Sequence, residues 1–437
     1  MKALYFCKDS GIADNELLLK HHHEWANRTL ELSSLSIDIN VLLDSLLELF
    51  SELFFLEMTR INTTSPKHFQ FSKPHLAHSP YFCPIMPSRF LFYLGHPAHY
   101  HNLKHAIRLL ELKGHSVKVV ARGKDVLFDL LEQENWDIHK LPARRPSGKI
   151  GLVASILKRE WQIFQLVRAF KPHLLAGTDL VIAHVGKLMG VPSVLINEDD
   201  SAAIPLMAKY GFPYATAILA PDCCDQAPAN HKKIGYAGCH ELAYLHPDFF
   251  QIDRALLPAK IQTLGRYFIL RFASLHAHHD AGRKGIDDEL ALRLIEILKP
   301  HGQVLITSER LLTPQLEPYR IPIHPREIHQ VMAHAALYIG DSQTMAAEAA
   351  VLGVPSIRFN DFVGELSYLE ELEHRFLLTK GIPTSQPEEL LLTASGWLAD
   401  SSIGNLWAAR RAAMLESTIS VTPFWIETFE RLAARNR

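Results

Sequence analysis

The sequence predicts an α/β protein with two Rossmann-like, doubly wound domains behind an N-terminal extension. Two observations lead to this prediction. From residue 86 onward, short apolar runs alternate with helical segments, as they do in the repeated βα units of a parallel sheet. The alternation pauses over residues 201–256 and then starts again, so two similar sets of units follow each other. We therefore expect an N-terminal domain over residues 86–255 and a C-terminal domain, ending in a helix, over residues 256–437.

The first set of units begins with the apolar run FLFYLG (residues 90–95), which predicts a buried strand. A helix over residues 102–115 follows, and Gly114 is of the residue type that commonly ends a helix. The same alternation predicts the next elements in order: strand 116–122, helix 126–136, strand 137–142, helix 152–172, strand 174–179, helix 180–190 and strand 192–200. Residues 201–256 look less regular, and we expect them to connect the two domains.

The second set of units begins at residue 267. It predicts strands over 267–274, 303–309, 338–341 and 355–360, and helices over 287–302, 328–337, 343–353 and 422–436. In open parallel sheets, ligands bind beyond the carboxyl ends of the strands. The loops that follow the strands are therefore the places to look for chemistry, and two domains that face each other would bring these loops to one cleft.

The composition excludes some classes of protein. Hydrophobic residues make up 48% of the 437 residues and charged residues 21%, which allows a full core. A net charge of −2 argues against a protein that binds nucleic acid by bulk electrostatics. The five cysteines form no Cys-x-x-Cys pair, which indicates neither a zinc site nor a disulfide framework. We expect a cytoplasmic protein, or one peripheral to a membrane, without a metal or other cofactor.

Residues 1–85 differ from the rest. The apolar stretch over residues 39–58 contains four acidic residues, which are too costly for a helix that spans a bilayer. No basic segment with a short apolar core is present, so a signal peptide is not indicated. An amphipathic helix is one interpretation. We favour another, in which the folded protein begins at Met86 and the extension is a mis-assigned start or a dispensable tail.

The segment YIGDSQTMAAEAAVLGVPSIRF (residues 338–359) combines a strand, a polar corner, an alanine-rich helix, a Gly-Val-Pro stop and a second strand. Ser342 can cap the helix, and the free N–H groups of its first turn form an anion site, with Gln343 and Thr344 as further donors. Glu348 lies one turn beyond Thr344 on the same helical face, where a carboxylate can accept hydrogen bonds from a ribose diol. The alternative is a capped helix with a solvent-facing glutamate.

This segment resembles the donor-binding segment of hydrolysing UDP-N-acetylglucosamine 2-epimerases (DSGG-x-x-EE-x-x-x-LG-x-P) and of GT-B glycosyltransferases. Residues 86–378 are more specifically similar to the family called domain of unknown function 354, through GHPAHYHNLKHAI, CHELAYLHPDFF, ILRFASLHAHHDAGRKGI and residues 324–373. The resemblance implies a GT-B fold with diphosphate on Ser342, Gln343 and Thr344 and ribose on Glu348. Gln-Thr stands where the epimerases have Gly-Gly, so phosphate approaches less closely or is held by side chains.

Histidines follow the first strand in the segment GHPAHYHN (residues 95–102). In some GT-B glycosyltransferases a histidine of this loop is the general base for the acceptor hydroxyl, a task that suits a pKa near neutrality. The resemblance therefore makes His99 and His101 candidate catalytic bases. The alternative is a polar turn that caps a helix; a zinc site is not favoured, because no cysteine or carboxylate is near in sequence.

Acidic residues end two other strands of the first domain: Asp179 in AGTD, and Glu198 and Asp199 in INEDD. Hydrolysing epimerases place acids at the matching strand ends, so the resemblance implies that these carboxylates transfer protons in an epimerase-like mechanism. The alternative is a solvated turn, or an aspartate that caps the next helix.

Two arginines end strands of the second domain. Arg271 can pair with phosphate, and Arg358 can reach the sugar, with surface ion pairing as the alternative. His276 and His278 could serve as metal ligands, but a metal site is not favoured. The loop at residues 324–329 matches the part of GT-B proteins that holds the nucleotide base, by position alone.

These features lead us to expect an enzyme whose substrate is a nucleotide-sugar, UDP-linked. Glycosyl transfer in surface-glycan or envelope synthesis, to a lipid- or glycan-linked acceptor, is the leading hypothesis and rests on analogy. An epimerase-like nucleotide-sugar hydrolase and a non-catalytic nucleotide-sugar-binding protein are the alternatives. We expect no nucleic-acid partner and no transmembrane segment.

Overall fold

A computed structural model of the chain describes residues 87–123, 125–142, 148–273 and 285–436. The predictions about residues 1–85, and about the histidines at positions 276 and 278, fall outside the described residues. Residues 83–145 and 156–437 form one compact unit, which contains the strands of both sheets. Within the described ranges, no helix is long and apolar enough to cross a membrane.

The first sheet is parallel throughout, and its strands lie in the order β3-β2-β1-β4-β5-β6-β7. Because β1 and β4 are neighbours, the connections turn in opposite directions on either side of them, and open α/β sheets bind ligands at such a switch point. The strands are β1 (Arg89–Leu94), β2 (Ser116–Gly123), β3 (Asp137–Pro142), β4 (Leu174–Gly177), β5 (Ser193–Ile196), β6 (Ala217–Pro221) and β7 (Lys233–Tyr236).

The helix after β1 begins earlier than predicted. It starts at Pro97 rather than at residue 102, because proline suits the first helical turn and the His96 side chain caps it by accepting from the Ala98 N–H (3.2 Å). His99 and His101 therefore lie on a helix and not in a loop. The helices of this part are α4 (Pro97–Leu112), α5 (Asp125–Leu131), α6 (Gly148–Phe170), α7 (Leu180–Met189), α8 (Pro205–Tyr210), α9 (Leu242–Leu245) and the 3₁₀ turn η1 (Asn230–Lys232).

Residues 201–256 are more regular than predicted, since they contain β6 and β7, which extend the first sheet at one edge. Strands of five and four residues are too short to show a period-2 pattern. The β6 strand is buried throughout, and β7 is only partly buried, as expected for an edge strand.

The second sheet is also parallel, with the order β12-β11-β10-β8-β9. Its switch point lies between β8 and β10. The strands are β8 (Tyr267–Phe272), β9 (Gln303–Ser308), β10 (Leu337–Gly340), β11 (Ser356–Phe359) and β12 (Thr379–Ile382). The fold prediction of two doubly wound parallel sheets is therefore confirmed.

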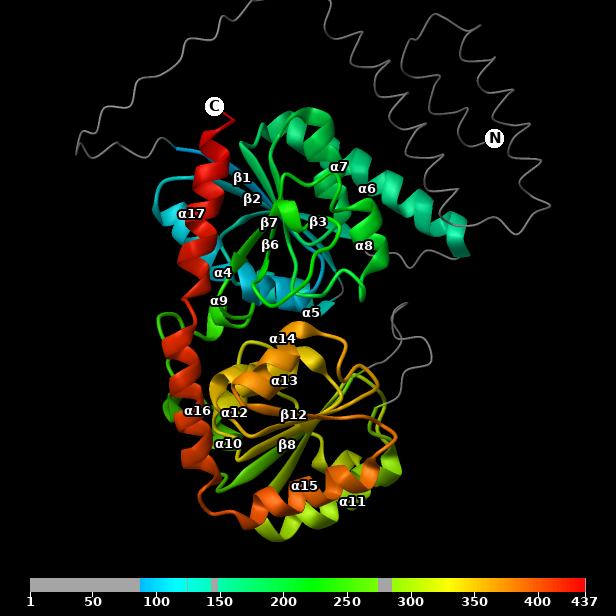
Figure 1. Ribbon diagram of the computed structural model, residues 1–437, viewed down its shortest axis with the longest axis vertical. Helices are drawn as coiled ribbons and strands as arrows, with labels where there is room; N and C mark the ends of the chain where they lie inside the picture. Colours follow the sequence, from blue (N-terminus) through cyan, green and yellow to red (C-terminus); the bar gives the residue numbers. More distant parts are fainter. Residues whose placement is uncertain (1–86, 124, 143–147, 274–284, 437) are drawn as a thin grey trace, which may run out of the picture. The chain divides into compact units, whose positions relative to one another are not determined.

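Helices of the second part complete the fold. They are η2 (Arg254–Leu256), α10 (Ala259–Gln262), α11 (Asp288–Leu298), η3 (Lys299–His301), η4 (Glu317–Tyr319), α12 (Ile328–Ala333), α13 (Gln343–Leu352), α14 (Ser367–Glu370), the π-helical turn η5 (Glu371–Arg375), α15 (Pro387–Ala399), α16 (Ile403–Ser417) and α17 (Val421–Ala434). The last helix, α17, packs against the first sheet beside α4 (Figure 1). The Phe429 ring contacts the ring of Phe92 in β1, and Glu430 forms an ion pair with Lys113 (2.9 Å).

Candidate functional site

His99 lies at the switch point of the first sheet, on the first turn of α4. The Gly95 N–H donates to its Nδ1 (3.0 Å), and Thr178 Oγ1, which follows β4, lies 2.8 Å from the same nitrogen. A backbone N–H can only donate, so Nδ1 is the acceptor and Nε2 carries the proton. Burial, with smaller effects of His96 and His240, lowers the pKa of His99 to about 3. The imidazole is therefore neutral at physiological pH, with its basic nitrogen occupied.

Asp179 follows β4 at the same sheet edge. Its Oδ1 caps α7 by accepting from the Val181 N–H (3.2 Å), and its Oδ2 accepts from Arg159 Nη1 (2.8 Å). Both carboxylate oxygens thus have partners. Thr178, the residue before Asp179, contacts the His99 ring, whereas the described partners of the Asp179 carboxylate are Arg159 and Val181.

Glu198 and Asp199 follow β5, the next strand in the sheet. Glu198 Oε2 lies 3.2 Å from His240 Nδ1, and Asn102 Nδ2 of α4 lies 3.5 Å from the same nitrogen. Burial, reinforced by the neighbouring Glu198, raises the pKa of Asp199 to about 7. A carboxyl with that pKa exchanges its proton at neutral pH, as an acid–base catalyst must.

Asp200 closes this acidic segment and is buried. Its Oδ1 accepts from the Asp225 N–H (2.7 Å) and from Ser367 Oγ (3.0 Å), and its Oδ2 accepts from the Ser367 N–H (2.7 Å). Asp200 therefore holds the start of α14 as well as the turn after β6. These bonds fix the backbone next to Asp199.

The switch point of the second sheet lies where β10 ends. The Asp341 carboxylate accepts from the N–H groups of Ala273 (2.6 Å), after β8, and Ile286 (3.4 Å), and burial raises its pKa to about 6. Ser342 caps α13, as predicted, by accepting from the Met345 N–H (3.4 Å).

The first turn of α13 leaves donors without partners. A helix of ten residues has no internal acceptors for its first N–H groups, and the cap occupies only one of them. The N–H groups of Gln343 and Thr344 make no hydrogen bond to another described residue. Free N–H groups of this kind can bind an anion, and the role of this turn as an anion site stays a prediction.

Glu348 is buried, with 5% of its surface exposed, so the solvent-facing alternative is wrong. Its Oε1 accepts from the Tyr244 hydroxyl (2.7 Å) and lies 2.8 Å from His329 Nε2. Burial alone would raise the pKa of Glu348, but His329 and Tyr244 outweigh burial and hold it below the usual value. Its Oε2 makes no hydrogen bond to any other residue in the described part of the chain.

His101 belongs to the same buried cluster. Its ring meets those of His329 (centroids 4.6 Å apart) and Tyr244 (5.5 Å), and burial holds its pKa well below the ordinary histidine value. Sequence reasoning did not find Tyr244 or His240. Both lie in the segment CHELAYLHPDFF (residues 239–250), whose only signal in the sequence is its resemblance to a family.

The two predicted arginines have partners. Arg271 pairs with Glu309, while its Nε is buried without a partner among the described residues. Arg358 has no exposed surface and donates to Glu370 (2.5 Å) and Glu373 (3.0 Å). Its contact with a sugar stays a prediction.

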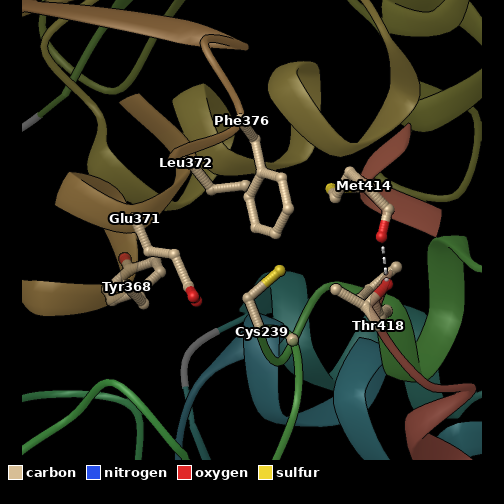
Figure 2. Close-up of a pocket in the computed structure, with 9 residues that line it drawn as sticks. Cys239, Tyr368, Glu371, Leu372, Phe376, Met414 and Thr418 are labelled. Atoms are coloured by element: carbon tan, nitrogen blue, oxygen red, sulfur yellow. Dashed lines mark hydrogen bonds between the residues drawn. The ribbon is translucent and has the colours of Figure 1, made fainter. Parts of the chain in front are cut away.

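Two further features of the described residues bear on the site. No group of three or more His, Cys, Asp or Glu side chains there is arranged to hold a metal ion. A small space beside residues 238–242 is lined mainly by apolar side chains, with the Cys239 sulfur pointing toward Phe376 (Figure 2). It is too narrow for a water molecule, so it offers no ligand site.

Solved structures resemble this chain over most of its length. A protein from Listeria monocytogenes that is named as a UDP-N-acetylglucosamine 2-epimerase has a TM-score of 0.55 at 14% identity, covering 74% of this chain and 90% of that one. The glycotransferase of kitacinnamycin has a TM-score of 0.53 at 13% identity, covering 79% of this chain and 99% of that one. MurG of Acinetobacter baumannii has a TM-score of 0.51 at 14% identity, covering 78% of this chain and 99% of that one. The fold is of the GT-B type. No protein-family model matches the chain. No curated protein matches it either.

Proposed function

We propose that the chain is an enzyme that acts on a nucleotide-activated sugar, UDP-linked, with the diphosphate at the start of α13. The observation that carries this proposal is the pairing of two features on one helix. Unpartnered N–H groups at Gln343 and Thr344 suit phosphate oxygens, and Glu348 Oε2, one turn further, suits a ribose hydroxyl. Arg271 at the end of β8 adds a cation at the same switch point. The GT-B fold supports this placement by analogy.

We infer that protons are transferred by the acids after β5. Asp199 has a pKa of about 7, and its neighbour Glu198 is paired with His240. His99 is less suited to the role of base, because its Nδ1 already accepts from a backbone N–H and its pKa is about 3. This inference favours the epimerase-like hydrolase over histidine-based glycosyl transfer.

The binding test uses two variants that differ in what they remove. Glu348→Gln keeps Oε1 as an acceptor for Tyr244 and replaces Oε2 with an amide, so UDP-sugar affinity should fall about ten- to a hundredfold by calorimetry. Tyr244→Phe removes a hydrogen bond of the buried cluster and leaves both carboxylate oxygens, so affinity should change little. Equal losses in both variants would mean that Glu348 acts through the cluster and not on the ligand.

The chemical test compares acids with histidines. Asp199→Asn and Glu198→Gln should lower turnover by about 10²–10⁴ with donor affinity unchanged. His99→Ala and His101→Ala should have the smaller effect on the chemical step. A larger loss of turnover in the histidine variants than in the acid variants would favour the glycosyl-transfer hypothesis. No effect in either set would favour a non-catalytic nucleotide-sugar-binding protein. Donor hydrolysis, epimerisation and transfer are measured on each variant.

The place of this reaction in the cell is proposed by analogy alone. Membership of the domain of unknown function 354 family and a role in surface-glycan or envelope synthesis both rest on resemblance. So do a lipid- or glycan-linked acceptor and a cytoplasmic, membrane-peripheral location. A screen of UDP-, GDP-, CMP- and dTDP-sugars by thermal shift identifies the donor, and acceptor searches follow from it.

A further inference from the structure

Two adjacent cysteines occupy the turn that follows β6. Their sulfur atoms, Cys223 Sγ and Cys224 Sγ, lie 3.9 Å apart. Cys223 is partly exposed, whereas Cys224 is buried, with 1% of its surface exposed. The turn is closed by the bond from the Cys224 N–H to the Pro221 carbonyl (3.1 Å). One thiol is therefore accessible from solvent, and the other lies directly behind it.

This turn supports the acidic segment after β5. The hydrogen bonds between the turn and that segment include Cys224 Sγ to the Glu198 carbonyl (2.9 Å), Gln226 Nε2 to the Asp199 carbonyl (2.9 Å), the Asp225 N–H to Asp200 Oδ1 (2.7 Å), the Ser201 N–H to the Asp225 carbonyl (2.9 Å), and Asn197 Nδ2 to Gln226 Oε1 (2.9 Å). The hydrogen bond with Cys223, together with burial, raises the pKa of Cys224, so this sulfur stays protonated and can donate. The hydrogen bond to the Glu198 carbonyl thus requires the reduced form of Cys224.

We propose that Cys223 and Cys224 are a modification site at which a low-molecular-weight disulfide, such as glutathione disulfide, forms a vicinal disulfide and displaces the acidic segment. The modification itself follows from the two thiols. Its effect on turnover rests on the proposed function, because it requires the acids after β5 to be catalytic.

The chemistry proceeds by thiol–disulfide exchange. The Cys223 thiolate attacks the small disulfide, an S–S bond to Cys223 forms, and the first small thiol leaves. Because only a thiolate attacks a disulfide, Cys224 must first give up its proton. Its sulfur then attacks Cys223 Sγ, the mixed disulfide breaks, and the second small thiol leaves with that proton. Two protein thiols are oxidised by two electrons, and one small disulfide is reduced to two small thiols.

The product should be easily reversed. Adjacent Cα atoms are about 3.8 Å apart, closer than the roughly 4.4–6.8 Å of ordinary disulfides, so the eight-membered ring is strained. Strained disulfides are readily reduced, which is typical of regulatory rather than structural bonds. Ring closure also removes the S–H donor of Cys224, and the Glu198 carbonyl loses its partner.

The experiment uses the full chain, reduced or incubated with glutathione disulfide. The tryptic peptide of residues 210–232 contains both cysteines, and in the oxidised protein it should be about 2 Da lighter, since two hydrogens are lost. Hydrogen exchange over residues 197–201 should become faster, and dithiothreitol should reverse both changes. Cys223→Ser is the matched control: it keeps the Cys224 donor, should retain the exchange pattern and activity of the reduced protein, and should not respond by ring formation.

A second variant separates the hydrogen bond from the oxidation. Cys224→Ala removes the donor to the Glu198 carbonyl, so the reduced variant should already show the faster exchange over residues 197–201. Where turnover is measurable, oxidation should lower it by up to about 10²-fold, the cost of an ångström-scale displacement of an acting group. The proposal is overturned if no lighter peptide forms, or if it forms while exchange over residues 197–201 stays unchanged. A lighter peptide with faster exchange and unchanged turnover would instead refute the catalytic role of the acids.

Discussion

Replacing Arg358 with methionine should destabilise the protein by about 2–4 kcal/mol at pH 7. Removing one partner of a buried ion pair costs about 3–5 kcal/mol, because the remaining charge is left without compensation. Here the guanidinium has no exposed surface, and Glu370 and Glu373 accept from it at 2.5 and 3.0 Å. The two glutamate side chains are 27% and 15% exposed, so water can partly replace the arginine, which lowers the expected cost.

The pH dependence follows from Glu370. Burial would raise its pKa, but the hydrogen bond and charge of Arg358 outweigh burial and hold the pKa below the ordinary value of 4.5. A depressed carboxyl pKa contributes stability that is present above the unfolded value and lost as the pH falls through the folded value. The deficit of Arg358→Met should therefore be largest near pH 7 and smaller near pH 4.

Urea denaturation followed by tryptophan fluorescence measures this deficit. The matched control is Arg293→Met, which breaks an arginine–glutamate pair with Glu388 (2.7 Å) whose side chains are 44% and 69% exposed. Exposed pairs contribute about 0–1 kcal/mol, so this variant should be nearly neutral. Equal losses in the two variants, or a deficit that grows toward pH 4, would show that Arg358 does not stabilise the fold through its glutamates.

Two further predictions concern the acidic segment. Asp199→Asn should be more stable than the parent above pH 7 and should lose this advantage near pH 4. A raised carboxyl pKa gives stability that is lost as the pH rises through about 7, and the variant has no such carboxyl to ionise. Parallel curves of stability against pH for the two proteins, measured by thermal denaturation, would contradict this prediction. Asp200→Ala should cost about 2–4 kcal/mol, since a buried carboxylate loses three hydrogen bonds, and the double variant with Ser367→Ala should cost less than the sum of the singles. Additive losses in the double variant would show that Asp200 and Ser367 do not interact.

The architecture was predictable because its signals are local. Alternating apolar runs and helices require only neighbouring residues, and they predicted both sheets and the cap at Ser342. The start of α4 was missed because Pro97 reads as a loop residue until His96 is seen to cap it. The strands β6 and β7 were missed because their pairing partners, and not their own short sequences, make them strands.

The contacts at the site were predictable only in part, because most of them join residues far apart in the sequence. Topology placed His99 next to the residue before Asp179, as neighbouring strand ends should be. Nothing local indicated that Tyr244, 104 positions away, donates to Glu348, or that His240 pairs with Glu198. Glu348 was selected by its helical spacing, yet its burial and its partners come from other elements.

Buried charge separates the groups with a structural role from those proposed to act. Glu134 and Glu370 accept from arginines, and their pKa values lie below the ordinary range, as in ion pairs that stabilise a fold. Asp341 is buried and Asp199 is partly buried, and both follow strands at or beside the two switch points. Among the described residues, neither carboxylate accepts a hydrogen bond from an arginine, and the loss of solvation raises their pKa values to about 6 and about 7. A fold selected only for stability would pair such carboxylates or replace them. Their position at the two places where α/β sheets bind ligands is the physical reason to seek the chemistry there.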